Sequence, residues 1–173
     1  MFIFYAFILL LIAQRLAELL IARRNEQWMK QRGAREFGQT HYRFIVFFHS
    51  LFFVSYWIEV TVWDSALSPI WPLLLTIFLF TQLVRVWALT SLGKFWNTKI
   101  IVLPGASVVQ KGPYRFLKHP NYMVVILEFI IIPLFFQAYY TTILFTVLNL
   151  LVLSIRIPAE EKALNELTEY PLK

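Results

Sequence analysis

The chain contains no cysteine among its 173 residues, so disulfides, cysteine-ligated zinc and thiol nucleophiles are excluded. Charged residues are scarce as well, at 15% of the sequence against roughly 25% in an average soluble domain. Hydrophobic residues make up 59% and aromatic residues 18%, and phenylalanine is the most frequent aromatic residue. This composition excludes a disordered chain and favours a protein in contact with lipid. The length excludes several large domains.

Several catalytic and metal-binding patterns are also missing. There is no Gly-rich phosphate loop, no nucleophile elbow and no His-Glu-x-x-His zinc helix. The three histidines, His41, His49 and His119, are dispersed and lack the spacing of metal ligands, so we expect no metal site. Base-reading modules are absent, and we expect no nucleic-acid partner. The net charge of +6 is therefore interpreted through membrane topology and anionic lipids.

Long apolar runs are what the sequence has in abundance. A membrane-spanning helix needs about 20 mostly apolar residues. Three segments meet this requirement: residues 1–22, 44–63 and 67–89. A fourth apolar region, 122–155, is too long for one span and is interrupted at Pro133 and at residues 137–142. It predicts a hairpin of two short helices, 122–136 and 138–156. The sequence thus predicts an all-α polytopic membrane protein with about five transmembrane helices.

The basic residues predict the orientation of these helices. Fourteen of the 16 lysines and arginines lie in residues 23–43, in residues 91–121 or after residue 155, and the loops near Asp64 and Tyr139 contain none. Cytoplasmic loops carry the excess of Lys and Arg. We therefore expect the N-terminus outside, the C-terminus in the cytoplasm and the polar segments at the cytoplasmic membrane face.

Charged residues within the apolar segments need partners. Arg85 lies at membrane depth, where a charge costs at least ~2.5 kcal/mol, and Glu128 lies at similar depth and is its expected partner. Arg85 is interpreted either as part of a structural pair or as a cation for an anionic substrate. Arg15 and Glu18 are three residues apart and are expected to pair with each other. Interfacial exposure is expected to account for Glu59.

A basic aromatic segment, 111–122, precedes the predicted hairpin. Pro120 at a first helical turn leaves the following backbone N–H groups free, and such a helix start can receive a carboxylate or phosphate. His119 and Tyr122 would project beside it. The alternative interpretation is that this segment anchors the chain at the lipid headgroups.

A second polar block, residues 156–161, follows the hairpin. Pro158 suits the first position of a short amphipathic helix, predicted over 159–169. Glu160 and Glu161 diverge by about 100° on a helix, so we do not expect both to serve one site in the same way. They are interpreted either as a solvated acidic first turn or as carboxylates that receive a cationic cofactor group or orient Arg156.

Together these motifs resemble the isoprenylcysteine carboxyl methyltransferase family of integral-membrane methyltransferases. The resemblance covers about residues 80–168 and rests on three blocks. The first block is Arg85, Gly93 and Asn97; the second is Gly112-x-Tyr114 leading into His119-Pro120-x-Tyr122; the third is Arg156, Glu160, Glu161 and Leu164. The chain departs from the family at Lys118, where arginine is usual, and at Met123-Val124, where many members place a glycine.

Residues 15–25, 32–36 and 95–105 look like a bacterial subgroup of this family. Members of that subgroup often accompany type III polyketide synthases and are taken to O-methylate alkylpyrones or alkylresorcinols. The resemblance implies an S-adenosylmethionine-dependent O-methyltransferase in a bacterial plasma membrane. Residues 1–79 would supply transmembrane helices and a basic cytoplasmic loop, and residues 80–173 would form the catalytic region.

The resemblance also implies roles for particular residues. Arg85 and Arg156 would hold the acceptor oxygen as an anion, and Glu160 would orient Arg156 or the cofactor ammonium, or assist proton removal. S-adenosylmethionine would be bound by six residues: Gly112, Tyr114, His119, Pro120, Tyr122 and Glu161. The acceptor would enter from the surrounding lipid as an alkylpyrone- or alkylresorcinol-type hydroxyl or a prenylated cysteine carboxylate. The alternatives are a non-catalytic lipid-binding membrane protein and an NADPH enzyme similar to sterol reductases.

Overall fold

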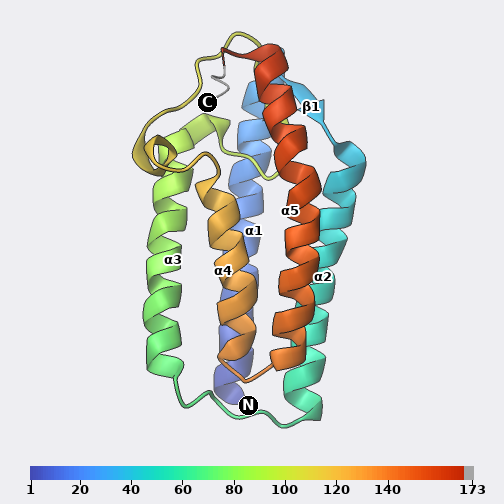
Figure 1. The fold of residues 1–173 in the computed structure, drawn as a ribbon, viewed down its shortest axis with the longest axis vertical. Coiled ribbons are helices and arrows are strands. Elements are labelled where there is room, and N and C mark those ends of the chain that lie inside the picture. Colours follow the sequence, from blue (N-terminus) through green and yellow to red (C-terminus); the bar gives the residue numbers. More distant parts are fainter. Residues whose placement is uncertain (170–173) are drawn as a thin grey trace.

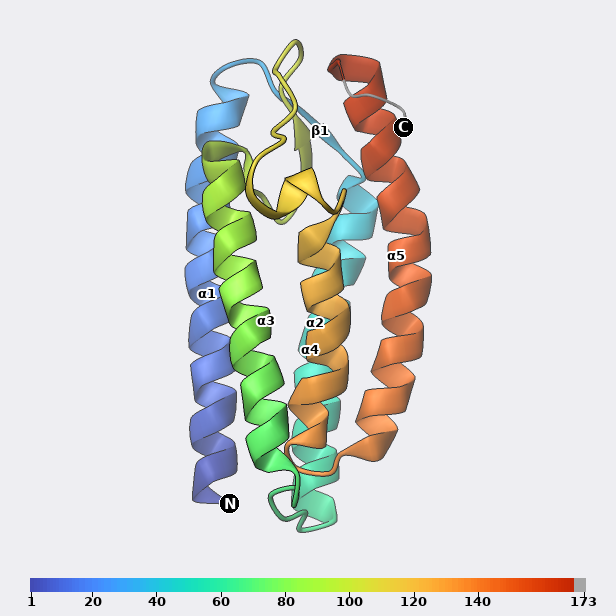
Figure 2. The ribbon, with the colours of Figure 1, turned by 60° about the vertical axis from the view of Figure 1, so that its left-hand side comes forward.

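Five long helices packed side by side form the body of the protein (Figure 1), in a computed structural model that describes residues 1–169. The helices are α1 (Phe2–Lys30), α2 (Gln39–Val62), α3 (Trp71–Leu92), α4 (Pro120–Leu134) and α5 (Tyr139–Leu167). The shorter elements are strands β1 (Arg35–Phe37) and β2 (Ile100–Val102) and the 3₁₀ turns η1 (Gly93–Phe95) and η2 (Gly112–Arg115). Successive helices run in opposite directions, and α4 packs between α3 and α5 (Figure 2).

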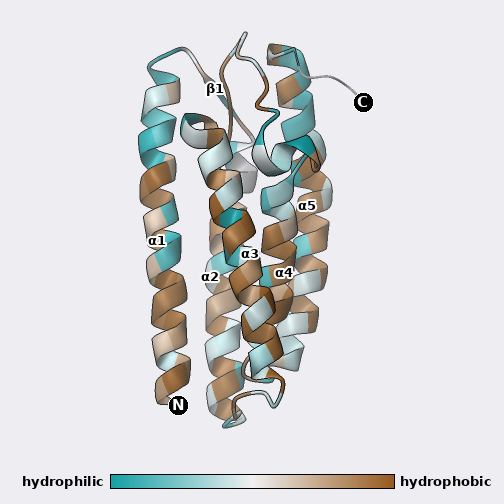
Figure 3. Cartoon of the chain, turned by 90° about the vertical axis from the view of Figure 1, so that its left-hand side faces the viewer, coloured by the Kyte–Doolittle hydropathy of each residue, from teal (hydrophilic) through white to brown (hydrophobic). Residues whose placement is uncertain are grey.

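Hydropathy confirms the predicted class of fold. Among the described residues, α1, α2, α3 and α5 are each long and apolar enough to cross a membrane. The 15 residues of α4 span about 22 Å, less than the roughly 30 Å of a hydrocarbon core. Apolar residues dominate the helices toward the N-terminal end of α1, and polar residues gather around the end that carries β1 (Figure 3). The chain is an all-α polytopic integral membrane protein.

The first helix is longer than predicted. It continues for eight residues beyond Ala22, so Arg23, Arg24 and Lys30 lie on a helix and not in a loop. Tertiary contacts hold this extension, because the Asn25 side chain donates hydrogen bonds to two carbonyls of the segment after α3 and Met29 is buried. Hydropathy alone could not locate the end of α1, because these contacts come from residues about 70 positions away.

The predicted break at Pro158 is wrong. The proline lies inside α5, which runs without interruption to Leu167, so there is no separate helix over 159–169. A proline within a helix costs about 3 kcal/mol because it lacks the N–H that bonds the preceding turn. Beyond it, Ala163, Leu164 and Leu167 pack against β2, and this contact offsets that cost.

Strands β1 and β2 form a small antiparallel sheet that closes the polar end of the bundle. Arg35 pairs with Val102 and Phe37 pairs with Ile100. The sheet was not predicted, although the β-branched run Ile100-Ile101-Val102 is typical of a strand. It joins the loop after α1 to the loop after α3, and its apolar face packs on α5.

Aromatic side chains fill the opposite end. Phe52 of α2 meets Phe129 of α4 with ring centroids 4.7 Å apart and Phe145 of α5 at 5.5 Å. Glu59 belongs to this end too, where it is partly exposed and also has partners that the sequence did not reveal. Its carboxylate accepts hydrogen bonds from the backbone N–H groups of Tyr140 and Thr141 at 3.0 and 2.7 Å. Glu59 therefore caps the free N–H groups at the start of α5.

Candidate active site

A cavity of about 730 Å³ lies at the polar end of the bundle. Its size falls within the roughly 300–1,000 Å³ of small-molecule sites. All five helices contribute to its walls, together with β2, η1, η2 and the loop between β2 and η2. Six of the nine predicted site residues line it: Arg85, Tyr114, His119, Tyr122, Arg156 and Glu160. The three blocks recognised in the sequence therefore meet at one chamber.

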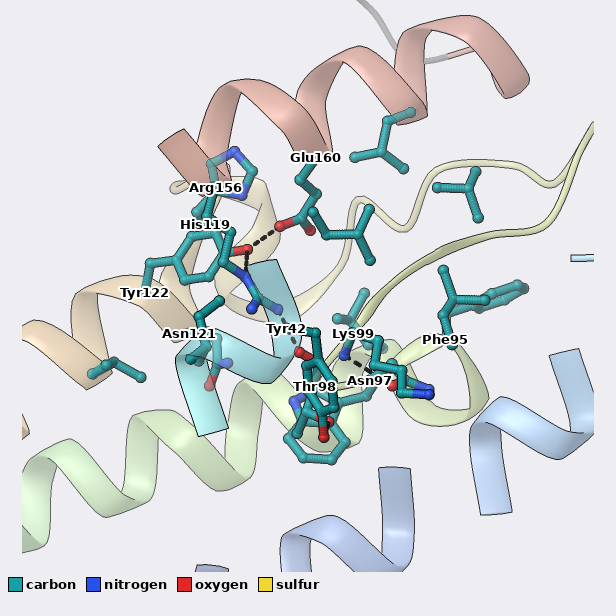
Figure 4. Close-up of a pocket in the computed structure, with 18 of the residues that line it drawn as sticks. Tyr42, Phe95, Asn97, Thr98, Lys99, His119, Asn121, Tyr122, Arg156 and Glu160 are labelled. Atoms are coloured by element: carbon teal, nitrogen blue, oxygen red, sulfur yellow. Dashed lines mark hydrogen bonds between the residues drawn. The ribbon is translucent and has the colours of Figure 1, made fainter. Parts of the chain in front are cut away.

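Tyr122 links the second block to the third. Its hydroxyl donates a hydrogen bond to the Glu160 carboxylate and accepts one from Nε of Arg156 at 2.9 Å (Figure 4). Arg156 also donates from Nη2 to the Thr98 carbonyl. These bonds use two of the five N–H groups of the guanidinium. The arrangement holds Arg156 in a defined orientation while leaving donors for a ligand.

The two adjacent glutamates have different partners, as predicted. Glu160 lines the cavity, whereas Oε1 of Glu161 lies 3.2 Å from Nε2 of His119 and 3.8 Å from Nζ of Lys118. Glu161 is not among the residues that line the cavity. It holds His119, whose ring centroid lies 5.3 Å from that of Tyr122.

Gly112 and Pro120 also lie outside the cavity wall. Gly112 has φ +61°, and a Cβ there would meet Oγ of Ser91 at 2.0 Å and Cβ of Ser91 at 2.9 Å. The residue is thus required for close packing of η2 on α3. Pro120 occupies the predicted first position of α4 and is buried. Both residues determine where the neighbouring Tyr114, His119 and Tyr122 lie.

Tyr114 contributes a protonated hydroxyl. Burial, together with the negative charge of Glu160, raises the pKa of Tyr114 above its ordinary value. The phenol therefore stays protonated at physiological pH and can donate a hydrogen bond to an anionic or neutral acceptor.

A cluster of four charged side chains, which we call the charged quartet, lies deeper in the bundle: Arg15, Glu18, Arg85 and Glu128. Arg85 is only 3% exposed and bonds both carboxylates, with Nη1 2.7 Å from Oε2 of Glu18 and Nη2 bonded to Glu128. Arg15 bridges the same two carboxylates, with Nη1 2.9 Å from Glu18. Both predicted pairs therefore form, joined into a single neutral cluster.

Two glutamines complete the quartet. Gln14 donates to Glu18 at 3.0 Å and to Gln82 at 2.7 Å, and Gln82 donates to Glu128 at 2.8 Å. Burying a charge is unfavourable unless it is paired and fully hydrogen-bonded. Because Arg15, Glu18 and Arg85 line the cavity, the quartet forms one of its walls at membrane depth.

Four buried polar atoms of cavity-lining residues have no hydrogen-bond partner within residues 1–169. They are Nε of Arg85, Nε1 of Trp96, Oδ1 of Asn121 and Nδ2 of Asn149. An unsatisfied buried polar atom costs about 1–3 kcal/mol. The walls thus contain three donors and one acceptor without a partner. They suit a ligand whose polar edges carry both acceptors and donors.

The sequence predicted no role for several cavity residues that the fold brings in. Tyr42 and His49 come from α2, Trp96 and Thr98 follow η1, and Asn149 comes from α5. Asn149 and His49 are polar side chains within apolar segments and could have been noticed for that reason. Tyr42, Trp96 and Thr98 carry no such signal, because polar and aromatic side chains are common near helix ends and in loops.

The fold and the cavity define a class: an integral-membrane protein with a chamber of mixed polar and apolar lining among its helices. The model of the isoprenylcysteine carboxyl methyltransferase family matches residues 73–166, more than half of the chain. The chain belongs to this family, which is one of membrane methyltransferases.

Similar proteins occur in two bacteria. The chain is 52% identical over 163 residues to the uncharacterized protein YpbQ of Bacillus subtilis (strain 168), covering 94% of this chain and 97% of that protein. It is 29% identical over 158 residues to an uncharacterized protein of Haemophilus influenzae (strain ATCC 51907 / DSM 11121 / KW20 / Rd), covering 91% and 92%. No solved structure matches the chain.

Proposed function

We propose that the protein is an S-adenosylmethionine-dependent O-methyltransferase that acts on a lipophilic acceptor at the cytoplasmic face of a bacterial plasma membrane. The observation that carries the proposal is the meeting of Arg85, Tyr122 and Arg156 at one cavity large enough for a nucleoside. Family membership supports the reaction class. The basic residues near this end support its cytoplasmic orientation.

The residues of the cavity fit S-adenosylmethionine. Its amino-acid end needs an acceptor for the ammonium and donors for the carboxylate, and the nucleoside needs partners for polar edges. Glu160, Tyr114 and Tyr122 supply polar groups for the amino-acid end. The unpartnered atoms of Trp96 and Asn121 suit the polar edges of the nucleoside. When bound, the cofactor supplies a methyl group activated by a sulfonium.

The protein's own part in this reaction is positioning and charge stabilisation. Arg156, held by Tyr122 and Thr98, and Arg85, held in the charged quartet, would hold the acceptor oxygen as an anion. Glu160 would orient Arg156 through the Tyr122 hydroxyl. In this proposal Gly112, Pro120 and Glu161 act on the cofactor site indirectly, by placing Tyr114, Tyr122 and His119.

The apolar part of the cavity wall supports a lipophilic acceptor that arrives from the surrounding lipid. The apolar lining includes Ile45, Val46 and Phe53 of α2, Val125 of α4 and Val152 of α5. The acceptor is a hydroxyl of the alkylpyrone or alkylresorcinol type, as in the polyketide-associated subgroup, or an isoprenylcysteine-type carboxylate. Both would place the reacting oxygen beside the arginines and a long apolar chain beside α2.

Two measurements on the purified full chain in detergent test the proposal. The first is saturable binding of S-adenosylmethionine by calorimetry. The second is transfer of labelled methyl to an alkylpyrone, an alkylresorcinol and a farnesyl-cysteine analogue. We expect binding and transfer to at least one acceptor. Binding of NADPH without S-adenosylmethionine would instead indicate a reductase, and binding of neither would indicate a lipid-binding protein.

A pair of variants on α5 locates the site. Glu160→Gln should lower kcat/KM by about 10²–10³, as loss of one preorganised polar group does elsewhere, with an unchanged thermal midpoint. Lys162→Gln is the control, because Lys162 is 78% exposed and does not line the cavity. Unaltered turnover in Glu160→Gln would refute the assignment.

A further inference from the structure

His49 of α2 lines the cavity but has no role in the function proposed so far. Its Nδ1 lies 2.8 Å from the carbonyl oxygen of Ile45, one turn earlier on the same helix. Because a carbonyl oxygen only accepts hydrogen bonds, Nδ1 carries the proton of the neutral ring. The lone pair is then on Nε2, which has no hydrogen-bond partner within the part of the chain that the structure describes.

Neighbouring rings hold the imidazole in place. Its centroid lies 5.2 Å from that of Phe129 on α4 and 5.8 Å from that of Phe48, with both contacts close to edge-on. The charged groups that act on the ring are Arg15 of α1, Glu128 of α4 and Arg156 of α5. Glu128 is already paired with two arginines, and a carboxylate has no proton to donate to the open lone pair.

The two acceptor classes differ in their need for such a lone pair. A carboxylate, with a pKa of about 3.5–4, is already ionised at neutral pH, whereas a phenol has a pKa near 10 and must lose its proton. A proton acceptor fixed next to arginines is therefore useful only for a hydroxyl, because the arginines stabilise the oxygen as its charge develops.

We propose that His49 is the general base of the reaction and that the acceptor class is a lipophilic phenol or enol. This inference rests on the proposed methyltransferase function. The acceptor O–H bond breaks and its proton passes to Nε2 of His49. The oxygen electron pair forms the new O–CH₃ bond, and the electrons of the C–S bond stay on sulfur as a neutral thioether. The imidazolium then returns its proton to water.

The first test compares two acceptors in one variant. His49→Gln should lower kcat/KM for a 5-alkylresorcinol by about 10²–10⁴, the usual contribution of a general base. Any methylation of a farnesyl-cysteine analogue should be unchanged. Thr61→Val is the matched control: it removes a similar side-chain bond to the carbonyl one turn earlier, on the same helix and away from the cavity.

The pH profile separates a base from a structural residue. The rate of the wild type should level off once His49 is neutral, whereas that of His49→Gln should keep rising about tenfold per pH unit as the hydroxyl ionises by itself. Added imidazole should restore part of the activity of His49→Ala. Equal losses for both acceptor classes, or a wild type that methylates only the carboxylate, would overturn the inference and leave the methyltransferase function standing.

A spectroscopic measurement needs no turnover. The chain has three histidines, so ¹⁵N signals of labelled protein in micelles can be assigned by comparison with His49→Gln. We expect the neutral ring to carry its proton on Nδ1 and its Nε2 signal to shift when a 5-alkylresorcinol is added without cofactor. A proton on Nε2 instead would refute the proposal. Failure of the protein to bind S-adenosylmethionine would refute the methyltransferase function itself.

Discussion

The two ends of the bundle are held together in different ways. Toward the N-terminal end of α1, aromatic rings from α2, α4 and α5 pack together, with Phe52 edge-on to both Phe129 and Phe145. At the other end, polar side chains hold the helices around a cavity, with Tyr122 bonded to Glu160 and Arg156. The charged quartet lies at the wall of that cavity. Close packing thus provides a rigid base, and hydrogen bonds between helices leave room for a ligand.

The largest effect is expected from the charged quartet. Glu128→Gln leaves Arg15 and Arg85 with only one carboxylate between them, and removal of one partner from a buried ion pair costs about 3–5 kcal/mol. Chemical unfolding in detergent measures this loss. Glu166→Gln, at an exposed pair on α5, is the control and should stay within about 0.5 kcal/mol. A similarly small effect of Glu128→Gln would mean that the quartet does not stabilise the fold.

The next largest effect is expected at Gly112. In Gly112→Ala the new Cβ meets Ser91 and the backbone must keep a positive φ, each of which costs about 1–3 kcal/mol. The thermal midpoint should fall, and the cofactor should bind more weakly because η2 moves. The double variant Gly112→Ala/Ser91→Gly should recover the part of the loss caused by the close contact. If the double variant recovers none of the stability, the whole loss comes from the positive φ of the backbone at residue 112.

A smaller effect, confined to stability, is expected in the aromatic end. Phe52→Leu removes part of a ring packed against Phe129 and Phe145, and the space left should cost about 1–2 kcal/mol. Cofactor affinity should be unchanged, since Phe52 does not line the large cavity. Unfolding and calorimetry on the same preparation measure both quantities. A clear loss of cofactor affinity in Phe52→Leu would contradict the separation of the two ends.

The smallest effect is expected at Glu59. Glu59→Gln keeps the size of the side chain but removes the charge that faces the positive start of α5, so a loss of about 1 kcal/mol is expected. The loss should shrink with added salt if the exposed part of this interaction is electrostatic. Thermal unfolding at two salt concentrations measures it, and Thr76→Val on α3 is a control outside this contact.

Local patterns predicted several parts of the site correctly. The three-residue spacing of Arg15 and Glu18 predicted one ion pair, and the similar depth of Arg85 and Glu128 predicted the other. Their union into one cluster was not predictable. Arg85 and Glu18 are 67 positions apart, and only the packing of α1 beside α3 brings them together.

Other features were missed for the same reason. Pro158 is a reliable local sign of a helix start, yet contacts of Ala163 and Leu167 with β2 keep α5 continuous. His49 is a polar side chain within an apolar helix, but only the fold shows that it lines the same cavity as Arg156. Local propensities are weak, and tertiary contacts worth a few kcal/mol reverse them.

Hydropathy and the positions of charged residues already specified a membrane protein with a polar face, and the three short blocks already specified its family. Both properties depend on composition and on spacing within a single segment. The shape of the chamber, the orientation of Arg156 by Tyr122 and Thr98, and the place of His49 were decided by tertiary structure alone. These features depend on the distances between helices, which packing determines and which no single segment encodes.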